Sequence, residues 1–189
     1  MLHRLALILC LAAVHAATSA AATGLKITVA GEANGVIEID LLEDVAPNHV
    51  ARITTLAKAS DYDNIAFHRV MSGFMAQTGD VQYGKMDKNL AQAGYGGSAL
   101  PDLKQEFSDI KFERGIVGMA RGSSVDSANS QFFLMLTDYP SLNNKYTVVG
   151  RITKGLDVLD KIKLGKGGNG AIIGAPDVLV KAEVIEDAS

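Results

Sequence analysis

One short segment of the sequence combines a cation, an amide and several large apolar side chains. Residues 67–80 read FHRVMSGFMAQTGD, with two apolar stretches around Ser72-Gly73. Side chains alternate between the two faces of a strand, so Phe67, Arg69 and Met71 are expected to share one face. An arginine between apolar neighbours needs acceptors for its five N–H donors. The segment therefore predicts a hairpin-like unit that presents one fixed cation, one amide and several apolar side chains.

The sequence lacks residues that thiol, zinc, serine-hydrolase and phosphate-loop sites require. Cys10 is the only cysteine and lies in an N-terminal apolar run, so neither disulfides nor thiol catalysis is expected. His49 and His68, the two histidines beyond residues 1–22, have no cysteines or close acidic cluster to complete a zinc site. Ser123-Ser124 has no nucleophile elbow, which argues against a hydrolase. The GKGGNG stretch within residues 165–174 lacks the Walker spacing, so a plain flexible loop is expected there. No metal or cofactor is predicted.

The composition predicts one globular domain with a complete core. Of the 189 residues, 48% are hydrophobic and 21% are charged. The formal net charge is -3 and the basic residues form no block, so neither nucleic-acid binding nor attraction to anionic membranes is indicated. Peptides or small molecules are the expected partners. No obvious assembly segment is present, and a monomer is expected.

The N-terminal residues have the pattern of a secretory signal peptide. A short positive segment at 1–4 precedes an apolar run at 5–14 and a small-residue stretch at 16–22. The run is shorter than the ~20 apolar residues that a membrane-spanning helix needs. We therefore expect cleavage of residues 1–22 and a mature domain at 23–189 that stays off the membrane. Two small-residue tripeptides leave the exact cut open.

The rest of the chain alternates mostly as short strands. Eight strands are expected, at residues 25–29, 36–41, 66–70, 74–77, 116–120, 131–136, 146–152 and 179–184. Pro47 suits the first turn of an amphipathic helix that ends before Ser60-Asp61, and a second short helix is expected at 156–162. Eight strands with two helices favour a closed or nearly closed antiparallel barrel over a doubly wound sheet.

Segment 67–80 closely resembles the signature of the cyclophilin-type peptidyl-prolyl isomerases. Four further stretches resemble the family's glycine turn, pocket strand, second signature and closing part: GYGG at 94–97, GIVGMA at 115–120, NSQFF at 129–133 and LNNKYTVVG at 142–150. The similarity runs in order from about Leu25 to about Val184. The loop in MARGSSVDSANSQFF has the length found in bacterial, exported members. The resemblance implies a mainly β fold, a closed eight-stranded antiparallel barrel capped by two helices, with a substrate groove on its outer face.

The resemblance also implies an enzyme that accelerates rotation about Xaa-Pro peptide bonds. The barrier is about 18–20 kcal/mol because amide resonance is lost as the bond twists, so the catalyst needs no nucleophile, metal or cofactor. Arg69 matches the catalytic residue, which donates to the pyramidal prolyl nitrogen of the twisted amide. Gln77 matches the amide that orients Arg69 and the substrate, and Phe133 completes the catalytic set.

The remaining positions match substrate-binding residues of the family. The proline ring would lie in a pocket formed by Phe74, Met75, Phe133 and Leu142. The backbone of Ala120 and Arg121 would hold the peptide, Gln131 would line the groove, Gly94 belongs to the glycine turn, and Tyr146 stands where relatives often carry histidine. By contrast, alternation sends Phe67, Met119 and Phe132 into the core. It also points His68 to the face opposite Arg69, which favours a structural role.

Departures from the family pattern concern ligands more than the fold. Met71, Ser72 and Thr78 are conservative differences. Ser141, just before Leu142, replaces the aromatic residue of the best-known members. Loss of a tryptophan there removes a large apolar contact and a donor, so cyclosporin binding is expected to be about 10- to 100-fold weaker.

Three functions are compatible with these patterns. The leading prediction is an isomerase that assists the folding of exported proteins, in the periplasm if the cell is Gram-negative. The second is a non-catalytic module of the same fold that binds proline-containing peptides. A third, a ligand-carrying barrel of the lipocalin type, would need a hollow interior, which the bulky residues predicted inside argue against.

Overall fold

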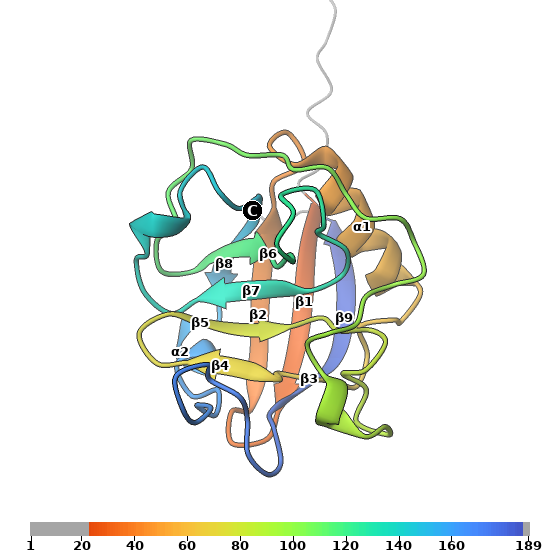
Figure 1. Ribbon diagram of the computed structural model, residues 1–189, viewed down its shortest axis with the longest axis vertical. Coiled ribbons are helices and arrows are strands. Elements are labelled where there is room, and N and C mark those ends of the chain that lie inside the picture. The colour runs from red at the N-terminus through yellow and green to blue at the C-terminus, as the bar shows by residue number, and fades with distance from the viewer. Residues whose placement is uncertain (1–22, 187–189) are drawn as a thin grey trace, which may run out of the picture.

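The computed structural model describes residues 23–186, which form one curled antiparallel sheet and two α-helices (Figure 1). The predicted signal peptide lies outside these described residues. The strands are β1 (Thr23–Ala30), β2 (Gly35–Leu41), β3 (Ile65–Ala66), β4 (Arg69–Met71), β5 (Met75–Thr78), β6 (Ile116–Met119), β7 (Phe132–Met135), β8 (Val148–Lys154) and β9 (Val178–Glu186). The helices are α1 (Pro47–Lys58), α2 (Leu156–Leu159) and the 3-10 turns η1 (Leu90–Gln92) and η2 (Pro140–Leu142).

The sheet has nine strands and is open, so the prediction of a closed eight-stranded barrel is wrong. Its order is β3-β9-β1-β2-β8-β6-β7-β5-β4, with β3 and β4 at the two ends. The difference arises where one strand was expected at 66–70. Strand β3 pairs with β9 and ends at Ala66, and strand β4 begins at Arg69 and pairs with β5. Phe67 and His68 therefore connect the two edges of the sheet without pairing in a strand ladder. The N–H of Phe67 donates to the Asp177 carbonyl instead, at 2.9 Å.

The two halves of the curled sheet enclose a filled core. In Figure 1, β4, β5 and β7 cross in front of β1, β2 and β9. The space between them holds aliphatic side chains from both halves, among them the fully buried Ile27, Ile37 and Leu134. This packing contradicts a hollow barrel of the lipocalin type. The predicted inward positions are confirmed, since Phe67, Met119 and Phe132 are all buried there.

Helix α1 begins at Pro47 and packs against β9 along the predicted stripe. Its buried side chains include Val50, Ile53, Leu56 and Ala57. The preceding Ala46 offers no capping side chain, so a carboxylate from a distant loop takes that role. Glu106 accepts from the backbone N–H groups of Asn48 and His49 at 3.2 and 3.1 Å, and His49 Nδ1 lies 2.6 Å from it.

Helix α2 is a single turn beside β2, shorter than predicted. Within residues 23–186, neither helix is long and apolar enough to cross a bilayer.

Candidate active site

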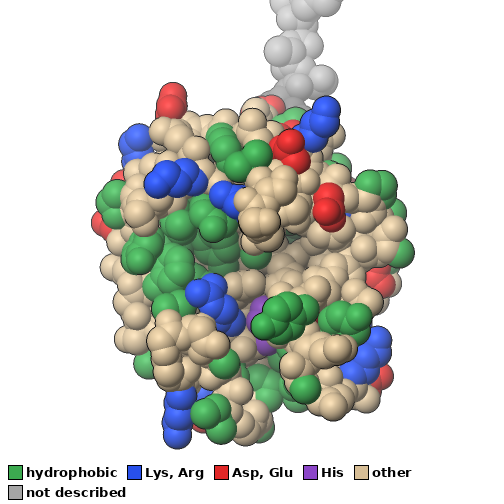
Figure 2. Space-filling model, viewed as in Figure 1, with side chains coloured by type: hydrophobic (Ala, Val, Ile, Leu, Met, Phe, Trp, Pro, Cys, Tyr) green, Lys and Arg blue, Asp and Glu red, His purple; other side chains and the backbone are tan. Residues whose placement is uncertain are grey.

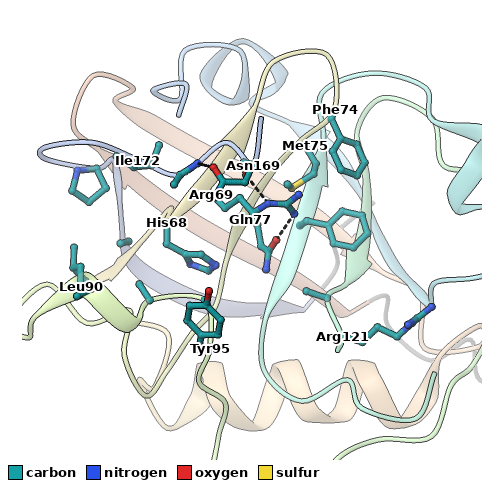
Figure 3. A pocket seen from close by; sticks show the side chains of 18 of the residues that line it. His68, Arg69, Phe74, Met75, Gln77, Leu90, Tyr95, Arg121, Asn169 and Ile172 are labelled. Carbon is teal, nitrogen blue, oxygen red and sulfur yellow. Dashed lines mark hydrogen bonds between the residues drawn. The ribbon is translucent and has the colours of Figure 1, made fainter. Parts of the chain in front are cut away.

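The hairpin of β4 and β5 places Arg69 and Gln77 side by side. Arg69 pairs directly with Gln77 in the antiparallel register, so both side chains project from the same face. Gly73 at φ +66° forms the turn between the strands. Nη1 of Arg69 donates to Oε1 of Gln77 at 3.0 Å (Figure 3). The predicted hairpin with a fixed cation and an amide is therefore confirmed.

Two further acceptors fix the guanidinium of Arg69. Its Nε donates to the main-chain carbonyl of Asn169 at 2.8 Å, and its Nη2 lies 3.0 Å from the sulfur of Met71. Partial burial lowers the pKa of Arg69 from its usual value, although Tyr146 opposes that effect. An arginine remains protonated in proteins, so the site holds a partly desolvated, oriented cation.

A directed chain of amides continues from Gln77 away from the arginine. Nε2 of Gln77 donates to Oε1 of Gln131 at 2.9 Å. Nε2 of Gln131 in turn donates to the carbonyls of Gly94 and Gly96 at 3.0 and 2.7 Å. The buried carboxylate of Asp80 accepts from the N–H groups of the same two glycines at 2.7 and 3.0 Å. Because the NH₂ group of Gln77 donates to Gln131, the carbonyl oxygen of Gln77 faces Arg69 and accepts its hydrogen bond.

An apolar pocket adjoins the guanidinium on the side of Phe74. Phe133 stacks on Phe112 at 5.8 Å between ring centroids and meets Tyr146 edge to face at the same distance. Gly118 makes room for these rings, because a Cβ there would lie 2.5 Å from the tip of Phe133. Phe112 therefore holds one face of the Phe133 ring and Tyr146 holds it edge to face. The fixed ring can serve as a flat wall against which another ring packs.

Together these groups line one pocket of about 660 Å³. Ten of the eleven predicted site residues line it: Arg69, Phe74, Met75, Gln77, Gly94, Ala120, Arg121, Phe133, Leu142 and Tyr146. The eleventh, Gln131, lies in an adjoining pocket of about 350 Å³ and reaches the first through Gln77. The guanidinium of Arg121 lies over the Tyr146 ring, 4.5 Å from its centroid. The structure thus brings the predicted residues together, while their roles stay predictions.

The position of His68 differs from its prediction. The imidazole lines the pocket beside Arg69 rather than facing away from it (Figure 3). Alternation fails here because Phe67 and His68 lie between β3 and β4 and belong to neither strand. For the same reason Phe67 does not share a face with Arg69 and Met71.

The glycine-rich loop at 165–174 is part of the pocket and is tied to the strand of Arg69. The N–H of Val70 donates to the Gly170 carbonyl at 2.8 Å, and the N–H of Gly165 donates to the Val70 carbonyl at 2.9 Å. The prediction of a plain flexible loop missed these bonds and the contribution of Asn169 to the site. The signal available in the sequence was the density of glycines, which permits close approach of two backbones.

Burial of His68 makes the fold sensitive to acid. Burial lowers the pKa of this imidazole below its usual 6.5, with nearby Asp80 opposing the shift. Below pH 6.5 the unfolded chain therefore binds a proton that the folded chain excludes, so the free energy of unfolding falls as the pH drops. The loss is at most ~1.4 kcal/mol per pH unit for one proton. Thermal melts from pH 7.5 to 5 should show a smaller decline in Tm for His68→Gln than for the wild type, whereas parallel curves would contradict the assignment.

The molecular surface is hollowed on the face that carries the pocket, with apolar side chains and a histidine along the hollow (Figure 2).

Residues 25–184 match the family model described as cyclophilin type peptidyl-prolyl cis-trans isomerase/CLD. The chain is 49% identical over 156 residues to a probable peptidyl-prolyl cis-trans isomerase of Brucella suis, covering 82% of this chain and 80% of that protein. It is 41% identical over 135 residues to a peptidyl-prolyl cis-trans isomerase of Helicobacter pylori, covering 69% and 76%.

Solved structures show the same fold. The cyclophilin AquaCyp293 of Hirschia baltica superposes with a TM-score of 0.69 at 26% identity, covering 85% of this chain and 73% of that one. A cyclophilin type isomerase of Cryptosporidium parvum, crystallised in the presence of the dipeptide Ala-Pro, gives a TM-score of 0.73 at 22% identity, covering 86% and 99%.

Proposed function

This chain belongs to the cyclophilin-type peptidyl-prolyl cis-trans isomerases, and we propose that Arg69 carries its catalysis of Xaa-Pro rotation. The family model spans residues 25–184, and relatives more than 40% identical share the activity in their names. The isomerase activity therefore follows from membership. The contributions of individual residues are inferred from the geometry of the pocket.

The proposed mechanism stabilises the twisted amide. A proline ring resting against Phe133 stays fixed while the preceding carbonyl swings. As the bond twists, the prolyl nitrogen becomes pyramidal and its lone pair is no longer delocalised into the carbonyl, so it can accept a hydrogen bond from the guanidinium of Arg69. A preorganised donor of this kind lowers the barrier because it needs no reorientation when the charge develops. Lowering the barrier by about 7 kcal/mol would give about five powers of ten in rate.

The observation that carries this proposal is the division of the donors on Arg69. Three of its five N–H groups are directed at Gln77, Asn169 and Met71. Counting acceptors in the described part of the chain, two N–H groups are left for a ligand. A guanidinium held at three points, with donors to spare and an apolar pocket beside it, suits catalysis better than a surface ion pair.

The substrates proposed for this chain are proline-containing polypeptides, in keeping with the Ala-Pro dipeptide named for the Cryptosporidium parvum structure. We extend the proposal to the folding of exported proteins. The pattern of residues 1–22 supports export, and the periplasm is the proposed compartment. Xaa-Pro isomerisation takes tens to hundreds of seconds at 25 °C without a catalyst, which is slow enough to be the rate-limiting step of folding.

The test is the refolding of a protein whose slow phase is limited by a trans-to-cis proline. Catalytic amounts of residues 23–189 should accelerate that phase, and the Arg69→Ala variant should do so far less. Equal slow phases with and without the folded wild-type protein would instead support a module that only binds proline-containing segments. N-terminal sequencing of the protein from a periplasmic fraction would test the cleavage of residues 1–22.

The exposed Ser141 is expected to weaken cyclosporin binding. It lies in η2 directly before Leu142, at the edge of the pocket, and offers neither an aromatic face nor an indole donor. Ser141→Trp should tighten binding about 10- to 100-fold, which calorimetry can measure. Unchanged affinity in a folded Ser141→Trp variant would show that this position does not limit the ligand.

A further inference from the structure

The pocket extends well beyond the residues that the proposed mechanism uses. On the far side of Arg69 from Phe133, two loops and the chain between β3 and β4 form a second half, the distal half. It is lined by Ala66, His68, Leu90, Ala91, Ala93, Tyr95, Ala171, Ile172 and Pro176. The whole pocket of about 660 Å³ falls in the roughly 300–1,000 Å³ range of sites that enclose drug-sized ligands. A proline ring alone leaves most of it unfilled.

One wall of the distal half is fixed before any ligand binds. Asn89 caps η1 by accepting from the N–H of Ala91 at 3.0 Å, and the N–H of Tyr95 donates to the Gln92 carbonyl at 3.1 Å. The buried Asp80 holds the adjoining glycine turn through Gly94. Leu90 and Tyr95 are thus presented by an ordered loop, with Tyr95 88% exposed at its rim.

The opposite wall is fixed in the same way. Ile172 packs partly against the main core, and its N–H donates to the His68 carbonyl at 3.3 Å. Ala171 accepts from the N–H of Lys166 at 2.9 Å, which closes the loop behind it. A groove whose two walls are preformed gains affinity because little ordering is needed on binding.

The chemistry of the distal half points to an apolar occupant. Its lining side chains are aliphatic or aromatic except for His68, and the polar Asn169 and charged Arg69 lie at its junction with the proline side (Figure 3). Because the pocket is continuous past Arg69, a polypeptide whose proline rests against Phe133 can extend into the distal half. A second molecule is not needed to fill it.

We propose that the distal half is a subsite for a large apolar side chain of the same polypeptide substrate, a few residues from the proline. This inference rests on the proposed function. It makes the enzyme selective for prolines that lie near leucine, isoleucine or phenylalanine, which are the segments exposed in unfolded chains and buried in folded ones.

The test uses a set of peptides with the same Ala-Pro core. Each peptide differs at one of the four positions before or the four positions after this core, and that position carries either leucine or asparagine. At one of these positions, kcat/KM is expected to be about 10-fold higher for the leucine peptide than for the asparagine peptide, as burial of one aliphatic side chain predicts. Leu90→Asp and Ile172→Asp, on opposite walls, should bring that ratio close to one and create a preference for lysine there. Ile173→Asp is the matched control, since Ile173 is 63% exposed and does not line the pocket.

Two results would overturn the subsite. One is a leucine-to-asparagine ratio near one at every position in the wild type, and the other is an equal loss of the ratio in Ile173→Asp. Either result leaves the proposed function intact if the Ala-Pro peptides themselves are isomerised. If none of the peptides is isomerised, the proposed function fails. The subsite is then still tested by fluorescence anisotropy, which measures binding of the same peptides carrying a fluorescent label. Thermal melts check that each variant is folded. If Ile172→Asp unfolds, Leu90→Asp still tests the subsite, because Leu90 lies outside the core.

Discussion

Replacing Arg69 with alanine is expected to lower kcat/KM for Xaa-Pro isomerisation roughly 10²- to 10³-fold, the usual loss on removal of one preorganised donor. The effect should fall mainly on kcat, because the donation to the prolyl nitrogen strengthens only as the amide twists. Phe74, Met75 and Phe133, which form the apolar side of the pocket, stay in place in this variant. Protease-coupled assays over a range of peptide concentrations separate the two constants.

Arg69→Lys is the informative companion to the alanine variant. Lysine keeps the charge but replaces the planar fork with one mobile ammonium, so it does not reproduce the separate donation of Nε to the Asn169 carbonyl and of Nη1 to Gln77. We expect it to recover only part of the lost activity. If charge alone were sufficient, Arg69→Lys would match the wild type. A folded Arg69→Ala variant within threefold of the wild type would remove Arg69 from the mechanism.

The second large effect is expected at Gly170, which fastens the glycine-rich loop to the strand of Arg69. Gly170 has φ +70°, and a Cβ there would lie 2.3 Å from Cγ of Met71 and 2.8 Å from the Val70 carbonyl oxygen. Gly170→Ala must push the loop away from β4, which moves the neighbouring Asn169 carbonyl off Arg69. Losing one hydrogen bond to a charged group costs about 2 kcal/mol, so kcat should fall roughly 30-fold.

Two neighbouring glycines supply matched controls for that variant. A Cβ added at Gly168 would meet no atom within 4 Å, so Gly168→Ala should be silent. Gly167 has the same φ of +70° but its Cβ would meet only Oδ1 of Asn169, at 3.9 Å, so Gly167→Ala isolates the backbone strain. In the Arg69→Ala background, Gly170→Ala should cost little further activity, because its effect acts through the arginine. A full additional 30-fold loss there would show that Gly170 acts by another route.

Much of the site could be predicted because it depends on local patterns. The pattern of residues 67–80 predicts a hairpin that presents a cation and an amide, and the observed antiparallel register sets Arg69 opposite Gln77. The buried stripe of α1 follows from its helical spacing in the same way. The pocket residues from distant segments, such as Phe133 and Leu142, came from the family resemblance rather than from periodicity.

The features that were missed depend on contacts between distant segments. His68 was assigned to the wrong face because the break between β3 and β4 is set by pairing with β9 and β5, which alternation does not report. The same break turns the expected closed barrel into an open nine-stranded sheet. Asn169 acts through its main-chain carbonyl, a group that every residue carries, so its type gives no signal.

Catalysis by Arg69 is tested most directly by NMR exchange spectroscopy of one Ala-Pro peptide with the wild type and with Arg69→Ala. The wild type should produce cis–trans exchange peaks, and the variant should still shift the peptide resonances on binding yet lose the exchange. That outcome separates binding by the apolar pocket from catalysis by the guanidinium. Exchange of equal rate in the folded, peptide-bound variant would contradict a catalytic role for Arg69.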